Sequence, residues 1–407
     1  MRFWSRLATW KKVLFALALL LVLVATLVVG LAARWLYLSF GESRQICILQ
    51  GTRTLLFTTV ASTRAIRPGA DGRLEEISVR LSGRDQRASL VLPWNCITDA
   101  DEWVPLFDWE DKHQRDNLTG KRQPSQWTNL LCLDLQTLEG RSILRTEDFI
   151  FPFGTMNCLD SRFMVLKSNY WSGDHSIPEL AAIFNVAEAT FSTIQHPMKA
   201  HRGLILLGEH DYLGIGYDPQ PGSSDEFYSD KPGYLSRSGE KVADNVHDIL
   251  AATPDLKRVF FVKHEPQASG ATISALWTYF PNERTTQRLM EWKGEKLRVT
   301  SDSKRFGFLE TKAGGQRNRR VIAGAHVFDV DGGPIRHFRF EEPIRPTGRS
   351  GRSFDWSPDW GVIAYFDESD IVVQSLEGEA LGRFRLFRWS DFGEYLKSVK
   401  EEPRSAS

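Results

Sequence analysis

Apolar and polar residues alternate with a period of two through three consecutive runs near the end of the chain, Gly361–Phe366, Ile371–Leu376 and Ala380–Phe387. Polar turns that contain Asp, Ser, Gly and Glu join these runs, and a short run, Ser353–Trp356, precedes them. Alternation between tight turns predicts four short strands in an antiparallel meander. A sheet of this size cannot bury both of its faces alone, so we expect it to pack between neighbours of the same kind.

The same pattern of strand, polar turn and strand recurs along the chain at a period of about fifty residues. The turns, which we use as register marks, centre on Ser82, Asp134, Asn185, Ser236, Phe280, Asp329 and Gln374. The mark at Asn185 also fits a helix, because apolar residues between Leu180 and Phe191 fall at helical spacing. Seven marks at a nearly constant period predict a fold made of repeated small sheets.

A polar turn followed by a strand precedes several marks, at Cys158–Leu166, Ser301–Leu309 and Ser357–Ala364, the last preceded by Phe354-Asp355-Trp356. With these motifs, residues 45–390 resemble the WD-repeat family and the bacterial periplasmic propellers that share its shape. The resemblance implies an all-β fold, a seven-bladed β-propeller, and it implies nothing about function. Radial repetition would also leave few exposed sheet edges.

The first apolar segment, Val13–Ala33, contains no charged residue and no proline. As a helix it would extend roughly 31 Å, enough to cross the hydrocarbon core of a bilayer. Basic residues between Arg2 and Lys12 precede it, which predicts a cytoplasmic N-terminus and an exported body. A cleaved signal peptide ending near Gly30-Leu31-Ala32 is the alternative, but the apolar run is longer than a usual signal-peptide core.

These features predict five consecutive parts of the chain. Residues 1–12 would be a cytoplasmic tail, 13–35 a transmembrane signal anchor, 36–44 a tether, 45–390 the propeller and 391–407 a C-terminal tail. A bacterial inner membrane with a periplasmic domain fits this topology best.

The charge of the chain is balanced, with 51 basic against 51 acidic side chains. This balance gives no bulk attraction to nucleic acid, so we expect no nucleic-acid partner. Cys47, Cys96, Cys132 and Cys158 all lie in the part expected to be exported. Disulfides in three alternative complete pairings, or buried thiols, are both compatible with this distribution.

Sequence motifs for catalysis or for metal binding are absent from the chain. It contains no GxSxG, HExxH, Walker loop or GxGxxG, and no Cys/His spacing typical of zinc. Asp329–Gly333 opens like a calcium loop, but the Glu that an EF-hand requires is missing, so we interpret it as a hairpin turn. We therefore assign no catalytic residue, metal or cofactor from the sequence.

We label the strands of each unit A to D from the propeller axis outward. The predicted B–C connections are long in most units: Ala61–Leu74, Ser168–Pro178, Asp218–Pro232, His264–Gly270 and Ala313–Arg320, with an irregular segment at Glu110–Gln126. Because strands alternate in direction, all B–C connections emerge on one rim and all C–D turns on the other. Long loops gathered on one rim commonly bind a partner.

Side chains typical of protein interfaces occur in these loops. The candidate binding residues are Trp171, His175, Asp225, Tyr228, Arg317 and Arg319. The alternative interpretation is that the loops are merely solvated and tolerate insertion.

The leading hypothesis is a membrane-anchored, exported propeller that binds or scaffolds a protein or another envelope component. The competing hypothesis is an enzyme, a hydrolase or lyase acting on glycans, that uses the axial funnel of the propeller. That enzyme would draw on His175, His210, Asp211 or His264, and it requires these groups to converge in one pocket.

Overall fold

The structure is a computed structural model of the 407-residue chain, and it contains two compact units, Met1–Ser43 and Arg44–Ser407. The residues it describes are 14, 17, 19–27, 30, 45–49, 53–58, 63–81, 90–91, 95–98, 103–115, 122–146, 149–150, 155–159, 162–167, 180–188, 190–197, 204–216, 233–313, 320–347, 353–368 and 370–386. All elements and contacts of the structure given in this article lie within these residues.

In the N-terminal unit, residues 19–27 are helical and exposed. Within this helix the Thr26 hydroxyl donates to the carbonyl of Val22 at 2.7 Å, so its polar group is satisfied by the helix itself. Among the residues described there, no helix has the length and hydrophobicity needed to cross a membrane. The signal anchor over residues 13–35 stays a prediction.

The larger unit consists of small antiparallel sheets, or blades, whose strands follow one another in chain order. Blade 1 contains β1 (Gln45–Leu49), β2 (Thr54–Thr58), β3 (Thr63–Pro68) and β4 (Leu74–Ser78). Blade 6 contains β23 (Gly294–Val299), β24 (Arg305–Ala313), β25 (Arg320–Asp329) and β26 (Pro334–Ile344). Blade 7 contains β27 (Phe354–Ser357), β28 (Val362–Asp367), β29 (Asp370–Ser375) and β30 (Ala380–Arg385).

Blades 4 and 5 form one continuous sheet. Blade 4 contains β16 (Ile205–Leu206), β17 (Tyr212–Gly216) and β18 (Gly233–Arg237), and blade 5 contains β20 (Val259–Pro266), β21 (Thr272–Phe280) and β22 (Thr285–Glu291). The long strand β19 (Glu240–Ala252) joins them, because its first half pairs with β18 and its second half with β20.

Blades 2 and 3 are less regular. Blade 2 contains β6 (Leu90–Val91), β8 (Trp103–Arg115), β9 (Arg122–Asp134) and β10 (Glu139–Thr146), and the short β5 (Arg80–Leu81) pairs parallel to β10. Blade 3 contains β11 (Phe149–Ile150), β13 (Arg162–Lys167), β14 (Leu180–Asn185) and β15 (Thr190–Pro197). Between them, β7 (Asn95–Thr98) pairs parallel to β12 (Thr155–Cys158).

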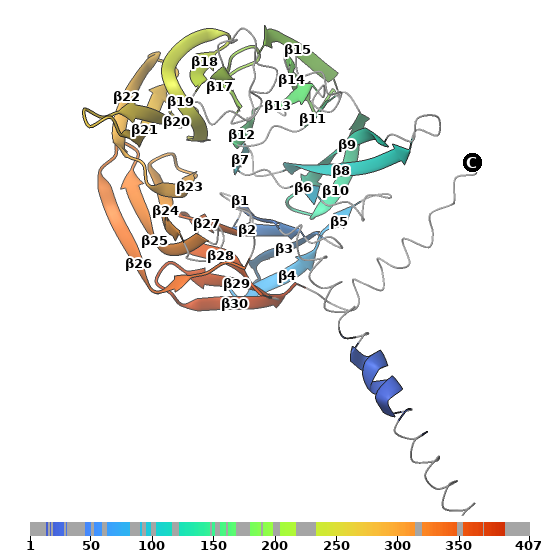
Figure 1. Ribbon diagram of the computed structural model, residues 1–407. Helices are drawn as coiled ribbons and strands as arrows, with labels where there is room; N and C mark the ends of the chain where they lie inside the picture. The colour runs from blue at the N-terminus through green and yellow to red at the C-terminus, as the bar shows by residue number, and fades with distance from the viewer. Residues whose placement is uncertain are drawn as a thin grey trace, which may run out of the picture. The chain divides into compact units, whose positions relative to one another are not determined.

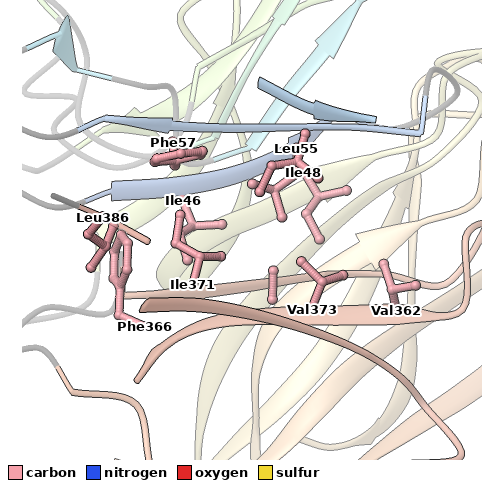
Figure 2. Close-up of a cluster of buried hydrophobic side chains, with 11 residues drawn as sticks. Ile46, Ile48, Leu55, Phe57, Val362, Phe366, Ile371, Val373 and Leu386 are labelled. Atoms are coloured by element: carbon pink, nitrogen blue, oxygen red, sulfur yellow. The ribbon is translucent and has the colours of Figure 1, made fainter. Parts of the chain in front are cut away.

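Neighbouring blades pack face to face, and the first blade packs against the last. Figure 1 shows the blades of this unit around a common centre, with β30 beside β4. The core between blades 1 and 7, drawn in Figure 2, contains Ile46, Ile48 and Phe57 from one blade and Phe366 and Ile371 from the other. Similar cores join blades 1 and 2, 4 and 5, 5 and 6, and 6 and 7. Four-stranded antiparallel blades packed side by side make this unit a β-propeller.

Cys47 and Cys132 lie in the core between blades 1 and 2, where both are buried thiols and form no disulfide. Of the two interpretations of the cysteines, buried thiols therefore hold for this pair. Thiols of this kind behave as small apolar side chains and contribute to packing.

A buried ion pair holds three blade segments together near the centre. Arg298 of β23 donates to both carboxylate oxygens of Asp355 in β27, and their side chains are 2% and 0% exposed. The second oxygen of Asp355 also accepts from the backbone NH of Ile48 in β1 at 2.8 Å. Because the carboxylate is paired and also accepts from a backbone NH, its burial in this core is compensated.

Six of the seven predicted register marks are C–D hairpins in the structure. Strand pairs meet at the marks of Asp134, Asn185, Ser236, Phe280, Asp329 and Gln374. The segment around Asn185 is a strand pair, not a helix, and Asn185 accepts from the backbone NH of Ala187 at 3.0 Å to close the turn.

The mark at Ser82 was wrong. The hairpin of blade 1 lies at Gly69–Arg73, where the NH of Gly69 donates to the carbonyl of Arg73 and Gly72 has φ of 80°. The alternating run after Ile77 misled the prediction because it leaves blade 1 at Ser78 and continues as β5 on blade 2. The prediction of a long B–C loop at Ala61–Leu74 was also wrong, because this segment contains the strand β3.

Candidate functional site

The six candidate binding residues, Trp171, His175, Asp225, Tyr228, Arg317 and Arg319, lie outside the described residues. The strands on either side of them are described. β13 ends at Lys167 before β14 begins at Leu180, and β24 ends at Ala313 before β25 begins at Arg320. Their placement on a binding surface therefore stays a prediction.

The described strands do fix the order of these connections within each blade. Residues 168–179, 217–232 and 314–319 each join the second strand of a blade to its third, and we call these three segments the B–C loops. The C–D hairpins close the opposite ends of the same strands, for example between β18 and β19. The segment Glu110–Gln126 of blade 2 differs from expectation, because paired strands run through it and only residues 116–121 connect them.

Of the residues named for a possible enzyme, His210, Asp211 and His264 are described, and these three do not converge, while His175 lies outside the described residues. His210 and Asp211 directly precede β17, and Ser238 in the C–D hairpin of blade 4 donates to Asp211 at 3.1 Å. His264 lies near the opposite end of its blade, where it pairs with Ser274 near the start of β21. Its ring lies 4.7 Å from that of His247 between centroids, with the two planes tilted by 34°.

Asp211 has a structural partner. Its carboxylate pairs with Arg237 at 2.5 Å, and Arg237 also donates to the Tyr279 hydroxyl at 3.2 Å, which ties blade 4 to blade 5. Burial alone would raise the pKa of Asp211, but the hydrogen bonds and charge of Arg237 and the bond from Ser238 outweigh it and lower that pKa. A carboxylate held ionised in this way is a poor proton donor at neutral pH.

A different cluster of chemically active side chains occurs on blade 6. Glu310 of β24, His326 of β25 and His337 of β26 lie on three adjacent strands. His326 pairs directly with His337 on one side and with Phe308 on the other. Phe308 lies two residues before Glu310 in β24, so the two side chains are on the same face of the sheet. Strand register therefore brings the three side chains together.

The geometry of this cluster is close. The Nε2 atom of His326 lies 3.5 Å from Oε2 of Glu310, and Nε2 of His337 lies 3.6 Å from the same oxygen. The two imidazole rings stack at 4.1 Å between centroids with 5° between their planes. Side-chain exposures of 33%, 27% and 48% for Glu310, His326 and His337 leave one side of the cluster open to solvent.

Gly324 makes room for the cluster. It stands opposite Glu310 in the strand register, and a Cβ atom added there would lie 3.3 Å from Nε2 of His337 and 2.4 Å from the carbonyl oxygen of Phe338. Any other residue would crowd the edge of the His337 ring that faces Glu310. The rings of Phe308 and Phe328 stack on that of His326, at 5.1 and 6.2 Å between ring centroids.

The environment of His326 favours its neutral form. Burial lowers the pKa of His326, the nearby His337 lowers it further, and the hydrogen bond and charge of Glu310 only partly offset this. Lys312 lies 3.8 Å from Oε1 of Glu310, on the oxygen that does not face the histidines.

Sequence motifs did not reveal this cluster, because its members are too far apart along the chain to form a recognised spacing. The hairpin predicted at Asp329–Gly333 brings the two strands that carry His326 and His337 together. A register shift between Val327 and Phe328 moves the pairing by one residue, so counting outward from the turn would have placed Arg336, and not His337, opposite His326.

The sequence matches no known protein-family model and no curated protein. It is similar in fold to solved structures at low identity. The oligogalacturonate lyase of Vibrio parahaemolyticus aligns with a TM-score of 0.47 and 11% identity over 81% of this chain and 86% of the lyase. TolB from Acinetobacter baumannii aligns at 0.41 and 10%, over 74% of this chain and 64% of TolB, so the chain spans just under two thirds of TolB.

The β-propeller domain of the Trilobed protease from Pyrococcus furiosus aligns at a TM-score of 0.43 and 9% identity, over 86% of this chain and 98% of that domain. These similarities concern the propeller fold alone. The architecture itself rests on the strand order and the packed blades of the larger unit.

Proposed function

We propose that this chain is a membrane-anchored, exported, seven-bladed β-propeller that binds or scaffolds a protein or another component of the cell envelope. The observation that carries the proposal is the unequal length of the connections at the two ends of blades 3 and 4. Their C–D hairpins are tight turns, such as Ser238–Gly239, whereas residues 168–179 and 217–232 separate the second and third strands of these blades. In blades 5 and 7 the corresponding connection is short.

Loop length has a direct physical meaning here. A tight turn exposes few side chains, while a long loop on a rigid scaffold presents a surface whose composition does not affect the core. The B–C loops carry Trp171, Tyr228, Arg317 and Arg319, the residue types enriched at the centres of protein interfaces. A partner bound at this rim would be recognised by aromatic contacts and charge-assisted hydrogen bonds.

The membrane part of the proposal depends on the sequence of the N-terminal segment. Val13–Ala33 is long and uncharged, and basic residues precede it, which favours export of the chain beyond Ala33. The short tether over 36–44 would then keep the propeller near the bilayer, where an envelope partner would be met.

The enzyme hypothesis has less support. It requires His175, His210, Asp211 or His264 to meet in one pocket, and the described members of that set lie toward opposite ends of their blades. The carboxylate of Asp211 also forms an ion pair with Arg237.

The experiment is crosslinking in native membranes followed by identification of the captured component. The variant combines Trp171→Ala with Arg319→Ala. Truncating an interfacial anchor costs at least about 2 kcal/mol, roughly thirtyfold in affinity, so capture should fall to near background. Loop substitutions of this kind usually change stability by less than about 0.5 kcal/mol, so the melting temperature should stay unchanged.

The matched control is Arg284→Ala, an exposed arginine beside the C–D hairpin of blade 5 that pairs with Glu240 at 3.3 Å. It should capture the partner as well as the parent protein does. Capture that persists in the loop variant while the protein stays folded would reject the B–C loops as the binding surface.

A further inference from the structure

We propose that Glu310, His326 and His337 form a binding site for a divalent transition-metal ion, with zinc as the ion best suited to it. This site lies on one face of blade 6 and does not involve the B–C loops, so it is independent of the envelope-binding function.

The chemical identity of the three side chains supports this proposal. Two imidazoles and one carboxylate are the ligands that Zn²⁺ takes in sites with three protein ligands and one open position. Imidazole also suits Cu²⁺, Ni²⁺ and Fe²⁺, whereas Ca²⁺ and Mg²⁺ prefer oxygen ligands throughout. The ligand set thus selects a transition metal over the alkaline-earth ions.

The distances fit the same ion. Metal–ligand bonds of about 2.0–2.2 Å at tetrahedral angles separate neighbouring ligand atoms by roughly 3.3–3.6 Å. Oε2 of Glu310 lies 3.5 Å from Nε2 of His326 and 3.6 Å from Nε2 of His337, and all three ligand atoms lie within 4.8 Å of one another. Both ring nitrogens therefore face one carboxylate oxygen at the separation a shared ion would require.

One adjustment is needed for the ion to bind. The imidazole rings are nearly parallel, at 5°, and in-plane lone pairs on parallel rings do not meet at one point. A rotation of the His337 ring about χ2 would direct its Nε2 toward the ion, and this torsion has a broad energy profile. His337 is the more exposed of the two histidines, so its ring has the space to turn.

The surroundings support the cluster on both sides. Gly324 places no Cβ atom beside the ring edge of His337, where a Cβ would lie 3.3 Å from Nε2. Lys312 approaches Oε1 of Glu310 at 3.8 Å, so Oε2 is the oxygen left for the ion. Hydrogen bonding or charge pairing of the second carboxylate oxygen is a common way to orient a ligating carboxylate. The open side of the cluster would admit a water molecule or a group from a partner as the fourth ligand.

The test is a calorimetric titration of the full-length protein, purified in detergent without a polyhistidine tag and stripped with a chelator, using Zn²⁺ as the probe. We expect saturable binding with one equivalent at this site. Co²⁺ in place of Zn²⁺ should give the visible absorption bands of a tetrahedral or five-coordinate nitrogen and oxygen site.

Two variants locate the site. Loss of an outer-shell partner commonly weakens metal affinity about 10–100-fold, so loss of a ligand in His337→Ala or Glu310→Gln should weaken it at least tenfold. The second variant keeps the shape of the side chain, so it remains informative if the first one unfolds. The control is His210→Ala, an exposed histidine on blade 4, which should bind as the parent protein does.

Three outcomes would overturn the proposal. They are no saturable Zn²⁺ binding, binding that survives both variants, and binding that His210→Ala abolishes. In the first case the cluster is a packing arrangement of aromatic and imidazole rings, and in the other two the ion binds elsewhere.

Discussion

The guanidinium of Arg64 in β3 donates a hydrogen bond to the main-chain carbonyl of Leu386, just beyond β30, so a side chain of the first blade holds the end of the last. Arg64 also donates to the carbonyl of Arg385 at 3.1 Å and to Glu76 at 2.7 Å, and its side chain is 3% exposed. Among the described strands, blades 1 and 7 share no ladder. Side-chain bonds and apolar packing join the two ends of the propeller.

Replacing Arg64 by Ala should lower the free energy of unfolding by about 3–5 kcal/mol, because it removes one partner of a buried pair with Glu76 and two bonds to carbonyls of the last blade. Chemical denaturation of the detergent-solubilised protein measures this. The control is Arg383→Ala on blade 7, whose side chain is 59% exposed and whose ion pairs with Asp367 and Asp370 should contribute far less, because solvent screens them. Equal effects of the two changes would contradict the role given to Arg64.

Ending the chain at Leu376 should destabilise the whole propeller and not the last blade alone. The truncation removes β30 and Leu386, which is 4% exposed in the core shared with blade 1, and it leaves β29 as an open edge. Thermal unfolding should shift to a lower temperature as a single transition. A truncated chain that melts at the temperature of the parent would argue against a closed ring.

Replacing Asp355 by Ala should cost about 3–5 kcal/mol, because the buried Arg298 loses its carboxylate and the NH of Ile48 loses its acceptor. The double variant Arg298→Met with Asp355→Ala should be more stable than Asp355→Ala alone, since it no longer buries that charge. Unfolding by urea compares the parent protein, the single variants Arg298→Met and Asp355→Ala, and the double variant. A double variant less stable than both single variants would show that the pair contributes little.

The ion pair of Asp211 with Arg237 should make stability depend on pH at the acid end. The pKa of Asp211 is lowered in the folded protein from an ordinary value near 3.8, so its contribution is complete above that value and is lost as the pH falls through the lower, folded-state pKa. Asp211→Asn should cost about 1 kcal/mol at pH 7, discounted because the side chain is 34% exposed, and progressively less as the pH falls below 3.8. Denaturation at several pH values tests this, with Asp244→Asn, at a side chain 64% exposed, as the control.

An alkaline phosphatase fused after Ser407 should be active if the N-terminus is cytoplasmic and the propeller is exported. The asymmetry of basic residues around Val13–Ala33 is the reason for this expectation. An inactive phosphatase, together with an active cytoplasmic reporter at the same position, would reject the topology.

Much of the fold can be predicted from alternation of apolar residues and from turn chemistry. The meander of blade 7 was predicted strand by strand, because its strands are short and Asp, Gly and Ser mark each turn. Blade 1 was not, because the run after Ile77 alternates as a strand should, while its residues belong to two different blades. Alternation reports that a segment is extended, and it does not report which neighbour the segment pairs with.

The sequence pattern also did not predict that blades 4 and 5 share the strand β19. Its thirteen residues read as one strand after the turn at Ser238, and nothing in the sequence shows that Val246 marks a change of pairing partner from β18 to β20. The cluster of Glu310 with His326 and His337 depends on the register of three strands, so it became visible only when all three were paired. By contrast, the candidate residues on the B–C loops rest on composition alone and stay predictions.

The contacts between blades 1 and 7, which include the bond from Ile48 to Asp355, determine when the propeller can finish folding. Ile48 and Asp355 are 307 residues apart in the sequence, so their bond cannot form until nearly the whole chain has been made. At synthesis rates of about 5–20 residues per second, that interval lasts roughly 15–60 s. Throughout it, the apolar face of blade 1 that carries Ile46 and Phe57 has no partner blade to cover it. A nascent chain built this way depends on protection from aggregation until its last blade emerges.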